Sequence, residues 1–154
     1  MNIRKVLPED IDQLVRMRWN FTYEDYPEVV AEYDAFYTEC RAFLEEAIRG
    51  DRWSIWLAEV DGAIMSHIFF QFIQKVPRPG RVTQPFAYMT NVYTLPEYRG
   101  QGIGSRIMQT IEQWGRDMRL EFIIVWPAED SVHFYEKNGY KLCTEPMELI
   151  LAND

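Results

Sequence analysis

Glycine stands at alternate positions, Gly100, Gly102 and Gly104, between a strand-like run and a helix-like run. Glycine lets the backbone curl so that successive N–H groups point inward, with no Cβ in the way. The helix that follows starts with unpaired N–H groups and the positive end of its dipole. The spacing predicts a strand–loop–helix unit that binds a phosphate-like anion, with Arg99 adding a charge-assisted contact. A plain glycine-rich helix entry is the alternative, but it gives no reason for the entropic cost of three glycines.

Two common phosphate loops do not fit this sequence. A Walker loop needs a lysine directly after its last glycine, and none follows here. A dinucleotide fingerprint needs Gly-x-Gly-x-x-Gly, and Ser105 breaks that spacing. Glu121 lies about as far along the chain as a ribose-binding acid, but it precedes its strand. The pattern that remains is Arg-x-x-Gly-x-Gly, formed by Arg99, Gly102 and Gly104.

Apolar periodicity divides the rest of the chain into strands and helices. The Asp61-Gly62 step between two apolar runs predicts a tight hairpin. Strands are expected at 2–6, 53–60, 63–75, 86–94 and 122–126, with a strand pair in 140–151. Helices are expected from residue 8 and at 28–49, 103–118 and 129–137. The order β-α-α-β-β-β-α-β-α-β-β predicts an α/β (α+β) fold, a mixed, mostly antiparallel sheet with helices on both faces.

Size and composition exclude several classes of protein. The 154 residues suit one domain, expected to span 1–154. The formal net charge of −8 disfavours general nucleic-acid binding, because no basic patch is available for phosphates. Cys40 and Cys143 are expected to be buried thiols, with a disulfide as the alternative, and no His, Cys or Asp cluster has metal spacing. Because no leader-like segment or membrane-spanning run is visible, a cytoplasmic protein without membrane contact is expected.

Three segments resemble one known family. Residues 95–104 resemble the cofactor loop of the GNAT (GCN5-related N-acetyltransferase) superfamily. Residues 58–62 followed by 66–68 resemble the central hairpin of that family. Residues 133–140 resemble its second conserved segment, Phe-Tyr-x-Lys-x-Gly-Phe. The resemblance covers most of residues 55–142, whereas the part up to about residue 52 is similar only in layout.

The resemblance implies an acetyl-CoA-dependent N-acetyltransferase that acts by direct attack in a ternary complex. Strands 86–94 and 122–126 would splay apart and hold the pantetheine arm between them. The residues implied in cofactor binding are Val92, Tyr93, Thr94, Arg99, Gly100, Gln101, Gly102, Ile103, Gly104, Ser105, Ser131 and Phe134. The N–H of Val92 would face the thioester oxygen. Ala128 stands where relatives often have an asparagine, so one polar contact to the arm is lost.

Tyr135 matches the position of the family's proton donor for the leaving thiolate. A phenol with pKa about 10 is protonated at neutral pH, so it can act as a general acid. Half-buried packing is the alternative role for this tyrosine. Thr90 and Asn91 occupy the place where many relatives carry a glutamate base, so the base is not assigned. The missing carboxylate at this place supports a second hypothesis, a non-catalytic CoA-binding sensor or interaction module on the same fold.

The acceptor is not identified by the sequence. Residues 24–46 are rich in acid, which suits a cationic amine but also the solvated face of a helix. The aromatic residues of 19–26 fit a pocket or the core about equally well. The apolar segment 147–151 suits strand pairing, so a homodimer is possible by analogy with such domains.

Overall fold

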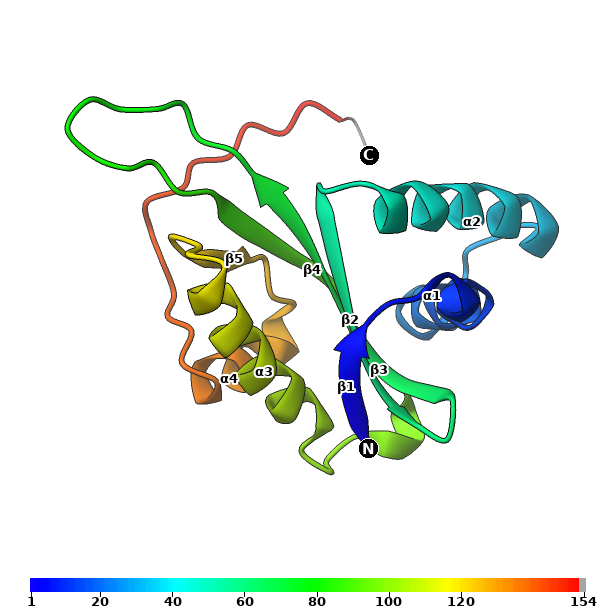
Figure 1. Ribbon diagram of the computed structural model, residues 1–154. Coiled ribbons are helices and arrows are strands. Elements are labelled where there is room, and N and C mark those ends of the chain that lie inside the picture. Colours follow the sequence, from blue (N-terminus) through cyan, green and yellow to red (C-terminus); the bar gives the residue numbers. More distant parts are fainter. Residues whose placement is uncertain (153–154) are drawn as a thin grey trace.

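A central sheet with helices on both faces forms the protein (Figure 1). The computed structural model describes residues 1–152. The strands, in spatial order, are β1 (Asn2–Lys5), β2 (Trp53–Val60), β3 (Ala63–Ile73), β4 (Phe86–Thr94) and β5 (Ile123–Val125). The helices are α1 (Ile11–Asp25), α2 (Tyr33–Arg49), α3 (Ile103–Asp117) and α4 (Val132–Lys137), with 3₁₀ turns at Pro8–Asp10, Pro96–Tyr98 and Glu129–Ser131. The mixed α+β class expected from the sequence is confirmed.

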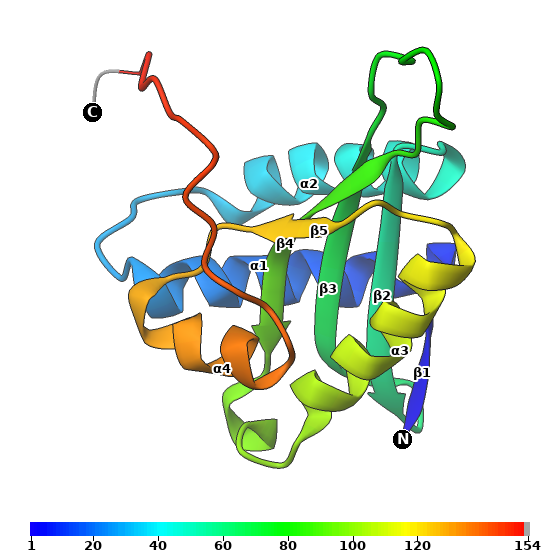
Figure 2. The same cartoon turned by 90° about the vertical axis from the view of Figure 1, so that its left-hand side faces the viewer.

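Two apolar cores lie on opposite faces of the sheet. Successive residues of β3 point to opposite sides, so Phe69 packs against α1 and α2, whereas Ile68 and Phe70 pack on the side of α3 and α4. Figure 2 shows α3 and α4 in front of the sheet and α1 and α2 behind it. Because both faces are covered, β3 is apolar along most of its length. Within residues 1–152, no helix has the length and apolar character needed to cross a bilayer.

The hairpin between β2 and β3 forms at the predicted step. Asp61 and Gly62 have φ values of 51° and 81°, as a two-residue turn between right-twisted strands requires. The next strand, β4, pairs antiparallel with β3 and parallel with β5. Its pairing with β5 covers only 87–89, so the sheet opens beyond Met89. The splay between these strands, implied by the family resemblance, is therefore present.

A β-bulge at Asn91 interrupts β4 and was not predicted. The register with β3 shifts between His67, which faces Tyr93, and Phe69, which faces Thr90. Asn91 adopts φ 49°, a left-handed conformation that asparagine tolerates better than most residues. The bulge bends the strand where its pairing with β5 has just ended, and so helps to open the sheet.

The strand pair expected within 140–151 is wrong. Residues 141–152 form no helix or strand, and Met147 is 99% exposed. An apolar run becomes a strand only where neighbouring groups pair with it and cover it. Here β5 presents an edge of only three residues, and Pro146 lacks an N–H for a ladder. The tail is therefore irregular, with its apolar side chains in solvent, and the expectation that Cys143 is buried is wrong, because this part of the chain has no cover.

The second helix begins later than expected. It starts at Tyr33 instead of residue 28, and Val30, assigned to its apolar stripe, is 97% exposed. The adjacent β-branched Val29 and Val30 disfavour a helix and contact no core that would compensate. The helices expected from residues 8 and 129 each start three residues later, after a 3₁₀ turn, and the other predicted ends differ by at most two residues.

Candidate functional site

The glycine loop has the geometry of an anion-binding turn. Gly100 and Gly102 have φ values of 72° and 76°, and no atom lies within 4 Å of a Cβ built on either residue. Gly102 directly precedes α3, whose first turn leaves its N–H groups without helical partners. Among the described residues, no acceptor pairs with the backbone N–H groups of 100–105. A run of free N–H groups at a helix start suits a phosphate.

Gly104 brings the loop against α4. A Cβ at this position would lie 3.1 Å from two ring carbons of Phe134, closer than side chains normally pack. The Phe134 ring therefore supports the start of α3 from behind. The structure thus gives the glycines different roles, since two allow the turn and the third allows close packing.

Arg99 holds the loop to the end of α1. Its guanidinium contacts Glu24 at 2.5 Å and donates to the Thr94 carbonyl at 2.9 Å. The Tyr93 hydroxyl donates to the same Glu24 carboxylate at 3.1 Å. The hydrogen bond from Arg99 holds the pKa of Glu24 below its usual range, which makes Glu24 a weaker base. The side chain of Arg99, predicted to contact the cofactor, is directed to Glu24 in this structure.

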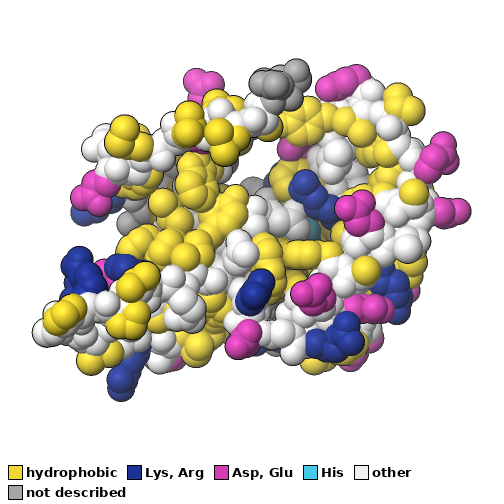
Figure 3. Space-filling view, turned by 90° about the horizontal axis from the view of Figure 1, so that it is seen from above, with side chains coloured by type: hydrophobic (Ala, Val, Ile, Leu, Met, Phe, Trp, Pro, Cys, Tyr) yellow, Lys and Arg dark blue, Asp and Glu magenta, His cyan; other side chains and the backbone are white. Residues whose placement is uncertain are grey.

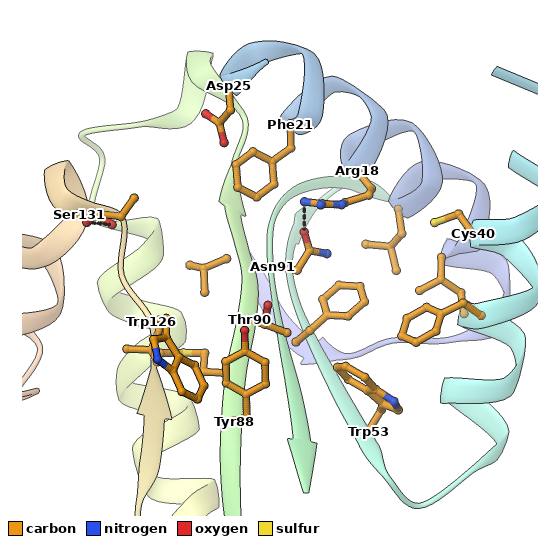
Figure 4. Close-up of a pocket in the computed structure, with 18 of the residues that line it drawn as sticks. Arg18, Phe21, Asp25, Cys40, Trp53, Tyr88, Thr90, Asn91, Trp126 and Ser131 are labelled. Carbon is orange, nitrogen blue, oxygen red and sulfur yellow. Dashed lines mark hydrogen bonds between the residues drawn. The ribbon is translucent and has the colours of Figure 1, made fainter. Parts of the chain in front are cut away.

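A cavity of about 680 Å³ lies between α1, α2 and the open part of the sheet (Figure 4). It brings together three predicted site residues, Val92, Ser131 and Tyr135. The glycine loop does not line it, because the loop lies beyond the end of β4. From above, the surface is hollowed, with hydrophobic side chains around the depression (Figure 3). We call this space the central cavity.

Tyr135 is the buried phenol of the central cavity. Its side chain is 7% exposed, and burial raises its pKa to about 12. The hydroxyl therefore stays protonated well above neutral pH, as a proton donor requires. Ser131 lies one turn earlier, where its hydroxyl donates to the Ala128 carbonyl at 2.9 Å. The two residues stand beside the opening between β4 and β5.

The aromatic and acidic residues near the first two helices divide between core and cavity. Trp19 packs against Tyr23 at a tilt and edge-on against Tyr33, between α1 and α2. Phe21 and Tyr26 instead line the central cavity. Its lining carboxylates, among the described residues, are Asp25 and Glu39. Within that part of the chain, no group of three His, Cys, Asp or Glu side chains could hold a metal ion.

His67 fixes the bulge at Asn91 from the core. Its Nδ1 lies 2.9 Å from the Asn91 carbonyl oxygen, and because a carbonyl only accepts, Nδ1 carries the hydrogen. Burial lowers the pKa of His67 to about 4. Its other ring nitrogen, Nε2, is buried without a hydrogen-bond partner. The ring is therefore a neutral structural group that holds the strand next to Val92.

Acid should weaken the fold through His67. Its folded-state pKa lies below the value of about 6.5 in an unfolded chain, so folding favours the neutral ring. This contribution is present above pH 6.5 and is lost as the pH falls toward 4, at about 3 kcal/mol. Urea unfolding at pH 7, 5.5 and 4.5 measures it. His67→Gln should reduce the loss of stability over this range, and an identical pH dependence in both proteins would contradict the assignment.

Arg18 is a cavity residue that the sequence analysis did not single out, and its partner Asn91 was noted there only as a position without a carboxylate. Arg18 Nη1 donates to Asn91 Oδ1 at 3.3 Å, directly over the bulge (Figure 4). The spacing of Leu14, Arg18 and Phe21 on one helix face could have identified Arg18. Nothing in the sequence around Asn91 indicates a bulge, because bulges depend on the pairing of two strands.

Known proteins of the same shape include several acetyltransferases. A predicted acetyltransferase from Clostridium acetobutylicum, crystallised with acetyl-CoA, is 24% identical with a TM-score of 0.80, covering 97% of this chain and 96% of that one. A GCN5-related N-acetyltransferase from Ralstonia eutropha is 22% identical with a TM-score of 0.77, covering 98% and 99%. Glucosamine-6-phosphate N-acetyltransferase from Arabidopsis thaliana is 19% identical with a TM-score of 0.72, covering 98% of each chain.

These identities are low, so the structural likeness by itself shows only a common fold. The sequence match is more specific, because the model of the acetyltransferase (GNAT) family matches residues 11–140. That range includes the glycine loop, the open strands and the helix that carries Tyr135. The chain belongs to the acetyltransferase (GNAT) family.

Proposed function

We propose that the protein transfers an acetyl group from acetyl-CoA to a primary amine by direct attack within a ternary complex. One observation carries this proposal: unpaired N–H groups at 100–105 follow the end of β4, and the phenol of Tyr135 lines the cavity beside the opening between β4 and β5. The first can bind a diphosphate, and the second can protonate a leaving thiolate. Family membership supports acetyl transfer in general.

The residues present fit acetyl-CoA, which would supply an activated acyl thioester. The N–H groups of Gln101, Gly102, Ile103, Gly104 and Ser105 would bind the pyrophosphate, with Gly100 allowing the turn. Main-chain groups of Val92, Tyr93 and Thr94 lie beyond the pairing with β5 and would bind the pantetheine arm.

The Val92 N–H would face the oxygen that becomes negative during transfer. A preorganised donor at such a position contributes about 3–4 kcal/mol in measured cases. Ser131 would contact the arm, and Phe134 would act through the loop that its ring supports.

Proton transfers complete the proposed mechanism. The attacking amine must lose a proton, and the leaving sulfur gains one from Tyr135. Burial, which raises the Tyr135 pKa to about 12, keeps this proton available through pH 9 to 10. Glu24 is held by Arg99 and Tyr93, and the described carboxylates that line the cavity are Asp25 and Glu39.

A two-step experiment tests the proposal. Acetyl-CoA is titrated into the protein by calorimetry, and the complex is then mixed with a panel of amines while free thiol is followed. Binding followed by amine-dependent thiol release is the expected result. Binding without turnover on any amine would favour a non-catalytic CoA sensor, which the absence of a carboxylate at Thr90 and Asn91 supports. Binding of ATP or NAD in place of acetyl-CoA would overturn both.

We also propose that two copies associate through their tails. A groove of about 520 Å³ lies between β5 and the tail, lined by Phe122, Trp126 and Leu142 among others. Each copy offers this apolar groove and, at Met147–Leu151, an exposed apolar segment that suits it. Light scattering after gel filtration should show a dimer for the full chain and a monomer after truncation behind Pro146. A monomeric full chain at tens of micromolar would contradict the dimer.

A further inference from the structure

The helix α1 turns one chemically mixed face toward the central cavity. Leu14, Arg18, Phe21 and Asp25 all line it, at spacings of four, three and four residues. A helix with 3.6 residues per turn places such positions on one side. Arg18 is the single Lys or Arg side chain among the described residues that line the cavity.

Most N–H donors of the Arg18 guanidinium have no hydrogen-bond partner among the described residues. One of its nitrogens bonds to Asn91 Oδ1 at 3.3 Å, and its guanidinium carbon lies 5.2 Å from the centre of the Phe21 ring. No ion pair with a carboxylate of the described residues engages it, in contrast to Arg99, which binds Glu24. A guanidinium has five N–H donors in a planar fork that matches a carboxylate. Arg18 is exposed to solvent, so its free donors offer an anion site at the open side of the cavity (Figure 4).

The contact between Arg18 and Asn91 puts this anion site close to the proposed position of the acyl group. Asn91, which Arg18 contacts, directly precedes Val92, whose N–H is the proposed donor to the reacting carbonyl. An anion held by Arg18 would therefore place an amine a few bonds away close to the acyl carbon. Asp25 lies two helical turns farther along α1, about 10 Å, so the cavity carries both signs of charge.

Aromatic side chains make up a large part of the remaining walls. Phe36 and Phe43 come from α2, Trp53 from β2 and Phe69 from β3, all facing the same space as Arg18. Such side chains favour an apolar or aromatic body, while the carboxylates of Asp25 and Glu39 suit the amino group of the same molecule. The volume of about 680 Å³ lies within the range of small-molecule sites.

We propose that the acceptor is a small primary amine that carries a carboxylate a few bonds from its nitrogen and an apolar or aromatic body, with Arg18 binding the carboxylate. This inference rests on the proposed acetyl transfer. In that step the amine nitrogen bonds to the acyl carbon as the carbon–sulfur bond breaks. The amine gives one proton to solvent, and the sulfur receives one from Tyr135, which solvent then reprotonates. The products are an N-acetylated amino acid and free thiol.

A matched pair of acceptors tests the proposal. L-phenylalanine and phenethylamine differ only in the carboxylate, and kcat/KM is measured for both with the wild type, Arg18→Ala and Arg18→Lys. The wild type should favour L-phenylalanine, and Arg18→Ala should lower kcat/KM for it by about 10- to 100-fold, as expected for loss of a charged hydrogen-bonded pair. Phenethylamine should change by no more than about threefold. Arg18→Lys should restore part of the preference.

Two controls separate a local effect from misfolding. Arg16→Ala, on the same helix but packed over Tyr33, should leave both acceptors unchanged. The affinity of Arg18→Ala for acetyl-CoA should equal that of the wild type, because the glycine loop does not line the cavity that Arg18 lines.

Several outcomes would overturn the inference. These are an equal loss for both acceptors in Arg18→Ala, a wild-type preference for phenethylamine or spermidine, or acetylation of no carboxylate-bearing amine although acetyl-CoA binds. If acetyl-CoA does not bind, the proposed function itself fails. Calorimetry with N-acetyl-L-phenylalanine then still tests the site: binding that Arg18→Ala abolishes supports it, and no binding to the wild type overturns it.

Discussion

Replacing Gly102 with valine should weaken acetyl-CoA binding by at least about 10- to 100-fold. Gly102 has φ 76°, and a β-branched residue in that region costs about 1–3 kcal/mol. The loop must either absorb this strain or change its conformation, and a change would turn the N–H groups of 100–105 away from the pyrophosphate. Each 1.4 kcal/mol lost corresponds to a tenfold weaker complex. Calorimetric titration with acetyl-CoA measures the effect.

Gly80 provides a matched control for this substitution. It also has a positive φ, 80°, with no atom within 4 Å of a Cβ built on it, but it lies in the loop between β3 and β4. Gly80→Val should therefore impose comparable backbone strain and leave acetyl-CoA affinity unchanged. Wild-type affinity in Gly102→Val, or an equal loss in both variants, would refute the proposed loop geometry.

Replacing Tyr135 with phenylalanine should lower kcat by roughly 100-fold or more while acetyl-CoA affinity changes by about twofold at most. General acid catalysis contributes about 10²–10⁴-fold where a positioned group donates the proton. The ring remains, so packing in the α3 and α4 core is retained, and only the hydroxyl is lost. Thiol-release kinetics at saturating acetyl-CoA, together with calorimetry, separate the two quantities.

Tyr140 is the control for Tyr135. It packs edge-on against Tyr135, and burial likewise raises its pKa, but it lines the groove beside β5 and not the central cavity. Tyr140→Phe should keep wild-type kcat. If Tyr135→Phe also keeps it, another group protonates the sulfur. The wild-type rate should not fall between pH 9 and 10 through loss of this proton, because the Tyr135 pKa is about 12.

Contacts with two helices, α1 and α4, hold the glycine loop in place. Arg99 attaches it to Glu24 on α1, and Phe134 packs beneath Gly104 from α4. The elements on both faces of the sheet therefore hold one turn of backbone in place. A donor site built on such a support binds with little reorganisation, which is the condition for effective preorganisation.

Local patterns predicted much of the fold because their causes are local. The limits of β2 and β4, the hairpin at Asp61-Gly62 and the amphipathic α3 follow from periods of two and 3.6 and from turn chemistry. The glycine loop also belongs here, since Gly100 and Gly102 adopt the positive φ values for which glycine is suited. The role of Tyr135 as an acid came from family resemblance and stays a prediction.

Features that need two distant segments were not predictable. The bulge at Asn91 exists because β3 and β4 pair out of step, and the tail around Met147 lacks the strand partner that its apolar pattern suggested. Arg18 was not selected from the sequence, because its place in the cavity lining depends on the packing of α1 beside the opened sheet. Strand pairing, the burial of apolar side chains and the formation of a cavity all depend on where the other helices and strands lie.

The sequence by itself determined the order of elements as far as α4 and the glycine loop, because each depends on residues close together along the chain. It also indicated the family, through three short segments that each carry a local motif. Only the tertiary structure decided that β4 and β5 separate after Met89, that a cavity fills the gap and that Arg18 and Tyr135 both line it. Those features arise from packing helices on two faces of a bulged sheet. Such packing brings together residues that are more than a hundred positions apart, and no local pattern encodes it.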